Sequence, residues 1–406
     1  MKINNRRKKK LRDNYMKKTV LFVLDEFHIG GVTTFIKQYA DVVKSKGKTI
    51  ILAFKSNITN PADYFPGSEI IIIDIEQHSG LINRIKYAAN FLIHLNRIYR
   101  KHDVGIVHFS TPWSALFAIL HPKTWTKKRV VTFYGALDLE ESSAYLGREQ
   151  GSRLKISIRI KNILKKKIQE FILTVSHKII TFSTYAKKLI EGYYSKEIGQ
   201  KVNIIPGYID VNLNMEIVGK SHRKFTIVNF GRAEPRKGLD LLLEAVYLLK
   251  KQTKVKLYIA SPVTYWDSLD LFKKYEELNL FDDVHFLHKL NNQQKKYLLS
   301  LADIFIMPSK DLETFGMTII ESLAAGVPVI GTPVGAIPEI LSKVDSLLVT
   351  EKISSKSIYE KLVWYLSLNG TEKLKIKKKG QSVVKKFYSR ELVEPLLAKV
   401  YADLGY

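Results

Sequence analysis

Short, uninterrupted apolar runs recur along this chain, and segments long enough to form helices separate most of them. A strand that is covered by helices on both faces has this continuous apolar pattern, whereas a half-exposed strand alternates apolar and polar residues. The first half of the chain therefore predicts a parallel β-sheet. Its expected strands are residues 19–25, 49–54, 69–73, 104–109, 129–133, 178–182 and 202–205.

The same pattern restarts after a polar stretch at residues 211–223, which indicates a boundary between two sheets. The expected strands of the second series are residues 225–230, 256–260, 284–287, 303–307, 327–330 and 346–349. Helices are expected at residues 32–46, 238–250, 355–368, 373–387 and 390–404. We therefore predict an α/β protein with two Rossmann-like, doubly wound parallel-sheet domains facing a central cleft.

These patterns divide the chain into four parts. They are a basic, disordered extension at 1–16, an N-terminal domain at 17–215, a C-terminal domain at 216–388 and a closing helix at 389–406.

The composition excludes several kinds of chemistry. The 406 residues include no cysteine, so disulfides, thiolate metal sites and a cysteine nucleophile are ruled out. No apolar run approaches the roughly 20 residues that span a bilayer, and the basic N-terminus lacks the apolar stretch of a secretory signal. We expect a cytoplasmic protein.

The formal net charge of +26 calls for an anionic partner, such as nucleic acid, anionic lipid or a phosphorylated small molecule. One basic cluster lies in residues 2–18, where Met16 also resembles a natural chain start. A second cluster at residues 148–167 mixes basic and apolar residues. Two interpretations of it stay open: a basic amphipathic helix lying on an anionic membrane at the inner face of the cell membrane, or a solvated helix face over the core.

Two loops in the second half carry the residues with the clearest chemistry. The first expected strand there runs into residues 231–240, GRAEPRKGLD, where Arg232 and Lys237 would place fixed cations beside a diphosphate. Further along, Glu313 is expected on a loop and Glu321 on the helix that follows it. The start of that helix, near Phe315 and Gly316, offers free backbone N–H groups to the phosphates of such a diphosphate.

Several motifs occur in a fixed order along the chain. They are Gly30-Gly31, Gly231-Arg232 with Lys237-Gly238, ADIFIMPS at 302–309, Glu313-x-Phe315-Gly316-x4-Glu321, GVPVI at 326–330 and Gly335-x3-Glu339. This set resembles family 4 of the retaining glycosyltransferases, which have the GT-B fold. The resemblance covers nearly the whole chain from residue 17 onward and is strongest between residues 225 and 341. It implies that the N-terminal domain binds the acceptor, that the C-terminal domain binds the nucleotide sugar, and that the closing helix at 389–406 returns to the N-terminal domain.

The resemblance implies a nucleotide-sugar donor, retention of configuration and no metal or other cofactor. Its acceptor would be a glycan, most simply a lipid-linked one at an anionic membrane surface. It also implies site residues: Arg232, Lys237 and Glu313 would be catalytic. Donor binding would use Gly30, Gly31, Arg232, Lys237, Glu313, Thr314, Phe315, Gly316 and Glu321.

Three departures from the family pattern bear on the sugar. Tyr134 stands where the family often has a histidine that meets the sugar, Pro206-Gly207 replaces a Pro-Asn-Gly sequence between the domains, and a glycine usual near Ala260 and Ser261 is missing. Tyr134 and His108 are candidates for the acceptor side, although His108 also suits a core position.

Alternative functions stay open at this point. They are a noncatalytic partner of a sister glycosyltransferase, protein O-glycosylation and a nucleotide-sugar epimerase. Binding of nucleic acid through the basic start is not expected, because the chain has no recognised nucleic-acid motif.

Overall fold

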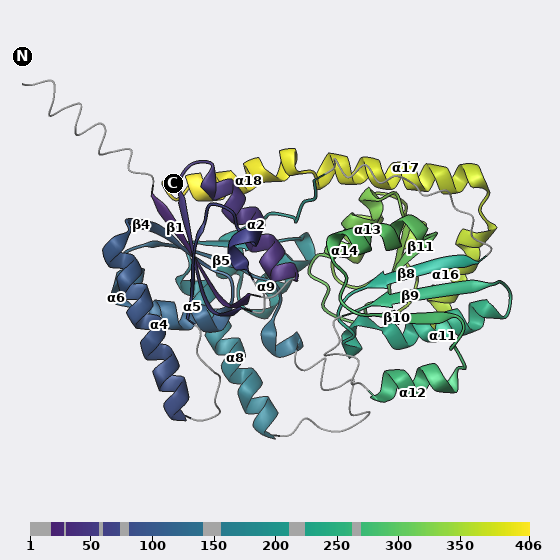
Figure 1. Cartoon of the computed structure of the whole chain (residues 1–406), viewed down its shortest axis with the longest axis horizontal. Coiled ribbons are helices and arrows are strands. Elements are labelled where there is room, and N and C mark those ends of the chain that lie inside the picture. Colours follow the sequence, from purple (N-terminus) through teal and green to yellow (C-terminus); the bar gives the residue numbers. More distant parts are fainter. Residues whose placement is uncertain are drawn as a thin grey trace, which may run out of the picture.

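Two parallel sheets, one in each half of the chain, organise the structure (Figure 1). The structure is a computed structural model that describes residues 18–27, 30–56, 60–73, 81–140, 156–210, 224–261 and 269–406. The predicted basic extension at residues 1–16, the polar boundary at residues 211–223 and residues 148–155 of the second basic cluster lie outside the described residues.

The first sheet has seven strands in the order β3-β2-β1-β4-β5-β6-β7, and every neighbouring pair is parallel. The strands are β1 (Thr19–Phe27), β2 (Lys48–Ser56), β3 (Glu69–Ile72), β4 (Val104–Phe109), β5 (Lys128–Thr132), β6 (Lys178–Thr181) and β7 (Val202–Ile204). The helices of this half include α2 (Gly31–Lys44), α3 (Pro61–Tyr64), α4 (Leu81–Lys101), α5 (Pro112–Ile119), α6 (Pro122–Trp125), α8 (Ile156–Val175), α9 (Thr184–Tyr193) and α10 (Lys196–Gln200).

The second sheet has five strands in the order β10-β9-β8-β11-β12, also parallel throughout. They are β8 (Phe225–Phe230), β9 (Val255–Ala260), β10 (Val284–Leu287), β11 (Ile304–Met307) and β12 (Val329–Gly331). The helical elements are η1 (Pro235–Lys237), α11 (Leu239–Lys250), α12 (Leu269–Glu277), α13 (Asn292–Leu301), α14 (Met317–Ala324), α15 (Ile337–Leu341), η3 (Ser346–Leu348), α16 (Ser355–Ser367), α17 (Gly370–Phe387) and α18 (Arg390–Ala402).

Strand β1 explains why the strands are continuously apolar. Val20 and Phe22 belong to one buried cluster, while Leu21 and Val23 belong to another, and all four are fully buried. Since alternate side chains of a strand point to opposite faces, both faces of this sheet are covered. The predicted pair of doubly wound sheets is thus confirmed.

The strand predicted at residues 346–349 is wrong. This segment forms the short 3₁₀ helix η3, and only Val349 makes an isolated bridge to Gly331 of β12. The side chain of Asp345 accepts a hydrogen bond from the backbone N–H of Leu347, which favours a turn over an extended strand.

The chain crosses between the domains twice, and the two crossings lie side by side. Ile209 pairs with Ser389 in a parallel bridge, so the outgoing segment contacts the returning one. Helix α17 runs along the second domain, and α18 then packs on α2 of the first (Figure 1). Among the described residues, no helix is long and apolar enough to cross a lipid bilayer.

Candidate active site

The strand order of each sheet reverses at its first strand, and the loops that leave these strands hold four of the predicted site residues. In each sheet the chain steps outward on one side of the first strand and then continues on the other side, beside β1 or β8. Ligands of doubly wound sheets bind at the carboxyl ends of the strands at this point. Gly30 and Gly31 follow β1, and the loop with Arg232 and Lys237 follows β8.

A buried ion pair joins the two predicted loops of the C-terminal domain. The ammonium of Lys237 lies 2.6 Å from Glu313 Oε2, and Ser309 Oγ donates to the same oxygen at 3.3 Å. The loops meet because β8 and β11, which precede them, are neighbours in the sheet. Burial raises the pKa of Glu313, but the positive charges of Lys237 and Arg236 outweigh it and leave the pKa below its ordinary value. Glu313 is therefore held as a carboxylate.

Arg232 and Arg236 share one carboxylate partner. Arg232 Nη1 lies 2.8 Å from Glu234 Oε1, and Arg236 Nε lies 2.9 Å from Glu234 Oε2. The side chain of Arg236 is buried and also donates to the carbonyl of Leu312 at 3.2 Å, whereas that of Arg232 is about half exposed. Sequence reasoning missed Arg236, which fastens the loop while Arg232 faces solvent.

Gly238 ends this loop in a conformation that a larger residue resists. Its φ is +66°, and a Cβ atom there would clash with the carbonyl oxygen of Pro308. Glycine is the residue that adopts such a φ without strain and permits this close backbone approach. The turn thereby holds Lys237 against the loop of Glu313.

The remaining predicted donor residues take different places. Glu321 lies in α14 and pairs with Lys295 of α13 at 2.8 Å, about a quarter exposed. Gly316, with φ +97°, is the N-cap of α14. The ring of Phe315 packs between Phe182 and Tyr388 at centroid distances of 6.1 and 5.8 Å, so only its backbone is available to a donor.

Thr314 contacts the N-terminal domain. Its hydroxyl donates to the carbonyl of Tyr134 at 2.7 Å, and its own carbonyl accepts from Ser183 Oγ at 2.7 Å. The loop that carries Glu313 is thus tied to the ends of β5 and β6, on the side expected to hold the acceptor.

Gly30 and Gly31 begin α2. Gly30 is the N-cap and no side chain caps the helix, while a Cβ atom at Gly31 would meet nothing within 4 Å. The N-terminus of α2 therefore has open space beside it, which suits the approach of an anion to backbone N–H groups.

The two residues predicted for the acceptor side, Tyr134 and His108, differ in their burial and contacts. The ring of Tyr134 contacts Phe35 and Phe182, and its hydroxyl is buried. His108 is fully buried and bonds Tyr401 Oη at 2.7 Å and Thr132 Oγ1 at 2.8 Å. The acceptor-side hypothesis for His108 is contradicted, because a side chain without exposed surface cannot meet an acceptor. His108 instead fastens α18 to the first sheet.

Glu140 brings an acidic group from the N-terminal domain toward the cations of the loop at residues 231–240, called the donor loop below. Burial raises the pKa of its carboxyl, and the positive charges of Arg236, Arg232 and Lys237 lower it less strongly. A Cβ atom at Gly135 would clash with the Glu140 carboxylate, so this side chain lies over the turn after Tyr134. No motif marks Glu140, and its proximity to the donor loop follows only from the packing of the two domains.

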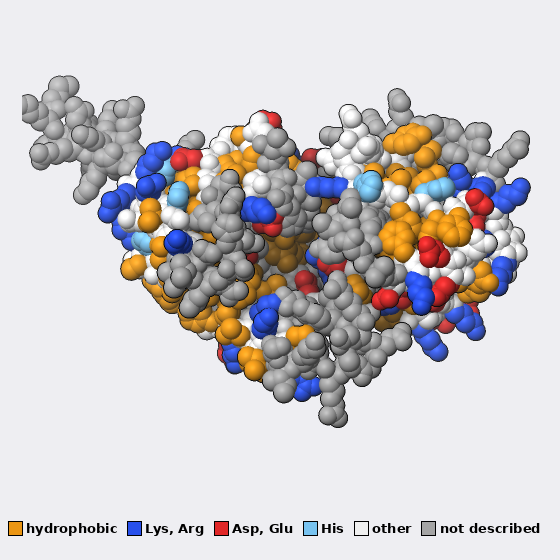
Figure 2. All heavy atoms as spheres, turned by 60° about the horizontal axis from the view of Figure 1, so that its bottom comes forward, with side chains coloured by type: hydrophobic (Ala, Val, Ile, Leu, Met, Phe, Trp, Pro, Cys, Tyr) orange, Lys and Arg blue, Asp and Glu red, His pale blue; other side chains and the backbone are white. Residues whose placement is uncertain are grey.

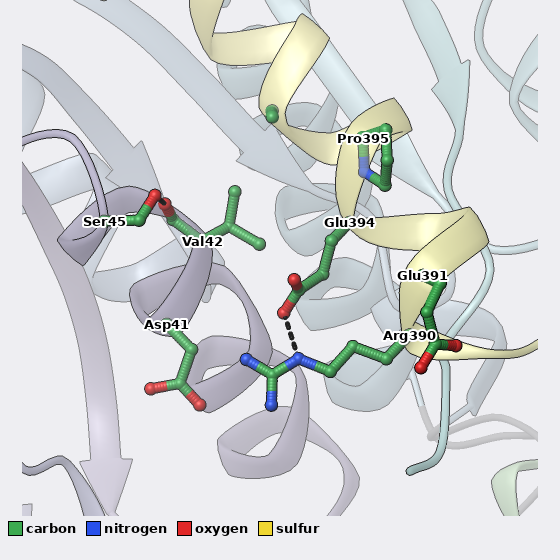
Figure 3. Close-up of a pocket in the computed structure, with 8 residues that line it drawn as sticks. Asp41, Val42, Ser45, Arg390, Glu391, Glu394 and Pro395 are labelled. Carbon is green, nitrogen blue, oxygen red and sulfur yellow. Dashed lines mark hydrogen bonds and ion pairs between the residues drawn. The ribbon is translucent and has the colours of Figure 1, made fainter. Parts of the chain in front are cut away.

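The surface is hollowed between the two domains, with hydrophobic and acidic side chains deep in the hollow (Figure 2). A separate cavity of about 320 Å³ lies between α2 and α18 (Figure 3). Arg390 extends there between Asp41 and Glu394, and its Nε donates to Glu394 at 2.6 Å. None of the predicted site residues lines this cavity.

Within the described ranges, no group of three or more acidic or histidine side chains could hold a metal ion.

Comparison with known proteins matches nearly the whole chain. Residues 29–213 match Glycosyltransferase Family 4, and residues 210–383 match Glycosyl transferases group 1. A human protein named as one of the subunits of phosphatidylinositol N-acetylglucosaminyltransferase is 25% identical over 94% of this chain and 75% of its own length. The phosphatidyl-myo-inositol mannosyltransferase of Mycobacterium tuberculosis is 23% identical over 77% of this chain and 76% of its own length.

A solved structure shares the fold. Anabaena Alr3699/HepE in complex with UDP-glucose has a TM-score of 0.74 and 14% identity, and the match covers 95% of this chain and 99% of that one. The two-domain arrangement expected from the sequence agrees with this likeness.

Proposed function

Because this chain belongs to family 4 of the glycosyltransferases and has their GT-B fold, we propose that it transfers a sugar from a nucleotide-sugar donor with retention and without a metal. The observation that carries the proposal is the buried pair of Lys237 and Glu313, next to Arg232. These residues lie at the carboxyl end of β8, where the strand order of the second sheet reverses. The bound UDP-glucose of the solved neighbour supports this class of donor.

The charges of the site suit a departing diphosphate. As the bond from the sugar C1 to the phosphate oxygen breaks, negative charge grows on that oxygen, and Lys237 and Arg232 would stabilise it. Glu313 would accept hydrogen bonds from the sugar hydroxyls, and Glu321 from the ribose. The acceptor oxygen bonds to C1 on the face that the diphosphate leaves, and its proton passes to the departing phosphate oxygen. Fixed cations of the chain would take the role that a divalent ion has in other transferases.

The first test needs no knowledge of the acceptor. In the presence of excess chelator, the purified protein should slowly hydrolyse one nucleotide sugar of a panel. That donor should also raise the apparent melting temperature, because it binds only the folded chain; at a concentration of about 100 Kd the stabilisation is about 2.7 kcal/mol. Binding without turnover would favour a noncatalytic partner of a sister transferase, and the absence of any nucleotide binding would refute the proposal. Hydrolysis that chelator abolishes would refute the metal-independent mechanism.

We further propose a lipid-linked acceptor at the cytoplasmic face of the membrane, in glycoconjugate biosynthesis. The human and the mycobacterial relative are both named for phosphatidylinositol substrates. Helix α8 supports membrane contact, because Ile160, Ile163 and Leu164 are 61, 63 and 56% exposed while Asn162 on the same helix is buried. A helix that exposes apolar side chains among lysines suits the surface of an anionic bilayer.

The membrane contact predicts a result in vesicle flotation. Exchanging Ile160, Ile163 and Leu164 together for serine should weaken binding to anionic vesicles roughly 1000-fold or more, since each loses about 1.5–3 kcal/mol of apolar burial. The fold should be unaffected, because these side chains are already exposed. Leu347→Ser, at an exposed leucine of the C-terminal domain, is the matched control. Binding of the native protein should also decrease with rising salt. Equal binding to neutral and anionic vesicles would contradict the electrostatic part of the proposal.

A further inference from the structure

Glu339 of α15 reaches across the interface between the domains and caps a helix of the other one. Its Oε2 accepts from the backbone N–H of Thr184 at 3.0 Å, and its Oε1 accepts from that of Tyr185 at 2.5 Å. Both N–H groups belong to the first turn of α9, where they have no partner within the helix. A carboxylate at a helix N-terminus gains from charge-assisted hydrogen bonds and from the helix dipole.

The turn before α15 is in direct contact with the backbone of Glu313. Ala336 donates its N–H to the carbonyl of Glu313 at 2.8 Å. Gly335 has φ +58°, and a Cβ atom there would clash with the same carbonyl. The turn therefore requires glycine, and it is fixed to the backbone of Glu313.

A second contact lies beside the first. Ser183, the N-cap of α9, donates to the carbonyl of Thr314, and the hydroxyl of Thr314 donates to the carbonyl of Tyr134. The loop that holds Glu313 is thus fastened to the N-terminal domain at its own residue Thr314 and, through the Gly335 turn, at Glu339.

We propose that Glu339 is a positioning residue, which sets the loop that carries Glu313 against the acceptor side of the N-terminal domain by capping α9. This gives a role to the Gly335-x3-Glu339 motif and rests on the proposed transfer reaction. Glu339 would act in transfer to the acceptor and not in nucleotide binding, because the side chains assigned to the diphosphate and ribose, Arg232, Lys237 and Glu321, lie within the C-terminal domain. Gly30 and Gly31 of the N-terminal domain would contribute only backbone N–H groups to the donor.

The test compares Glu339→Ala and Glu339→Gln in the full chain with the active donor of the panel. A displacement of about 1 Å between reacting groups can cost roughly 100-fold in rate. We expect kcat for transfer to decrease about 100-fold in Glu339→Ala and about 10-fold in Glu339→Gln, which keeps one acceptor oxygen without the charge. The Kd for UDP, measured by calorimetry, should stay that of the native protein.

A scattering measurement supplies a readout that does not need activity. Small-angle X-ray scattering of the unliganded Glu339→Ala variant should give a larger radius of gyration, because the domains lose a contact. The matched control is Glu372→Gln: Glu372 also accepts a hydrogen bond from a helix-end N–H group, that of Asn369, but within one domain. It should change neither kcat nor the radius of gyration.

The outcomes separate the two proposals. Native kcat in Glu339→Ala, or a Kd for UDP weakened as much as kcat, would overturn the positioning role. An unchanged radius of gyration would also overturn it. Failure of every nucleotide sugar to bind the native protein would instead refute the proposed function, while the scattering comparison would still report on the contact.

Discussion

Lys237→Ala is expected to lower kcat about 100- to 1000-fold, the loss typical of removing one group that stabilises a developing negative charge. The ammonium of Lys237 lies at the diphosphate side of the site and also holds Glu313 in place. The variant should lose stability as well, by about 3–5 kcal/mol, because it leaves the Glu313 carboxylate buried without its partner. Steady-state turnover of the donor and denaturant unfolding measure the two effects.

A double variant separates catalysis from stability. Lys237→Ala combined with Glu313→Gln removes both charges, so the stability should largely return while turnover stays low. Lys310→Ala is the control, since Lys310 lies in the same loop as Glu313 but pairs with Asp240 nearer the surface. Native turnover in Lys237→Ala would show that this residue does not serve the leaving group.

His108 should make the protein less stable in acid. Burial lowers the pKa of His108 to about 3, from 6.5 for a free histidine, and both of its hydrogen-bond partners are hydroxyl groups. Below pH 6.5 the histidine side chain is protonated in the unfolded chain but not in the folded chain, so the free energy of unfolding decreases as the pH is lowered toward 3. This contribution is fully present above pH 6.5, and it is lost at about 1.4 kcal/mol per pH unit, or about 3 kcal/mol at pH 4.

The comparison of variants isolates this contribution. Other histidines with lowered pKa values, such as His177 and His285, add slopes of the same sign. The difference in unfolding free energy between the native protein and His108→Gln should therefore shrink steadily from pH 6.5 to 4. Tyr401→Phe removes the hydrogen bond but keeps the histidine, so its pH slope should match that of the native protein. Parallel pH profiles for the native protein and His108→Gln would contradict the assignment.

The succession of strands and helices along the chain could be predicted from the sequence, because a strand covered on both faces is a continuous apolar run of a few residues. The runs around β1 and β8, and the glycine-rich loops after them, identify two doubly wound sheets without any tertiary information. The loop positions of Lys237 and Glu313 followed from the same reasoning, since the carboxyl ends of neighbouring parallel strands meet at one edge.

Local pattern was insufficient where a neighbour distant in the chain sets the environment. The segment 346–349 has the composition of a strand, but the side chain of Asp345 begins a 3₁₀ turn there. His108 reads equally well as a cleft residue or a core residue, and only the docking of α18 places Tyr401 over it. The apolar residues of α8 only roughly follow helical spacing, and the sequence also allowed a helix face over the core. The packed structure leaves four of them exposed: Ile160, Ile163, Leu164 and Phe171.

The sequence by itself therefore determined the fold class, the succession of strands along the chain apart from residues 346–349, and the charged loops, because each depends on periodicity over a few residues. Only the tertiary structure decided that Glu140 approaches the cations of the donor loop and that Glu339 caps α9. These contacts join residues that are far apart in the chain. The distances between them depend on how the two sheets pack against each other, which no local sequence pattern encodes.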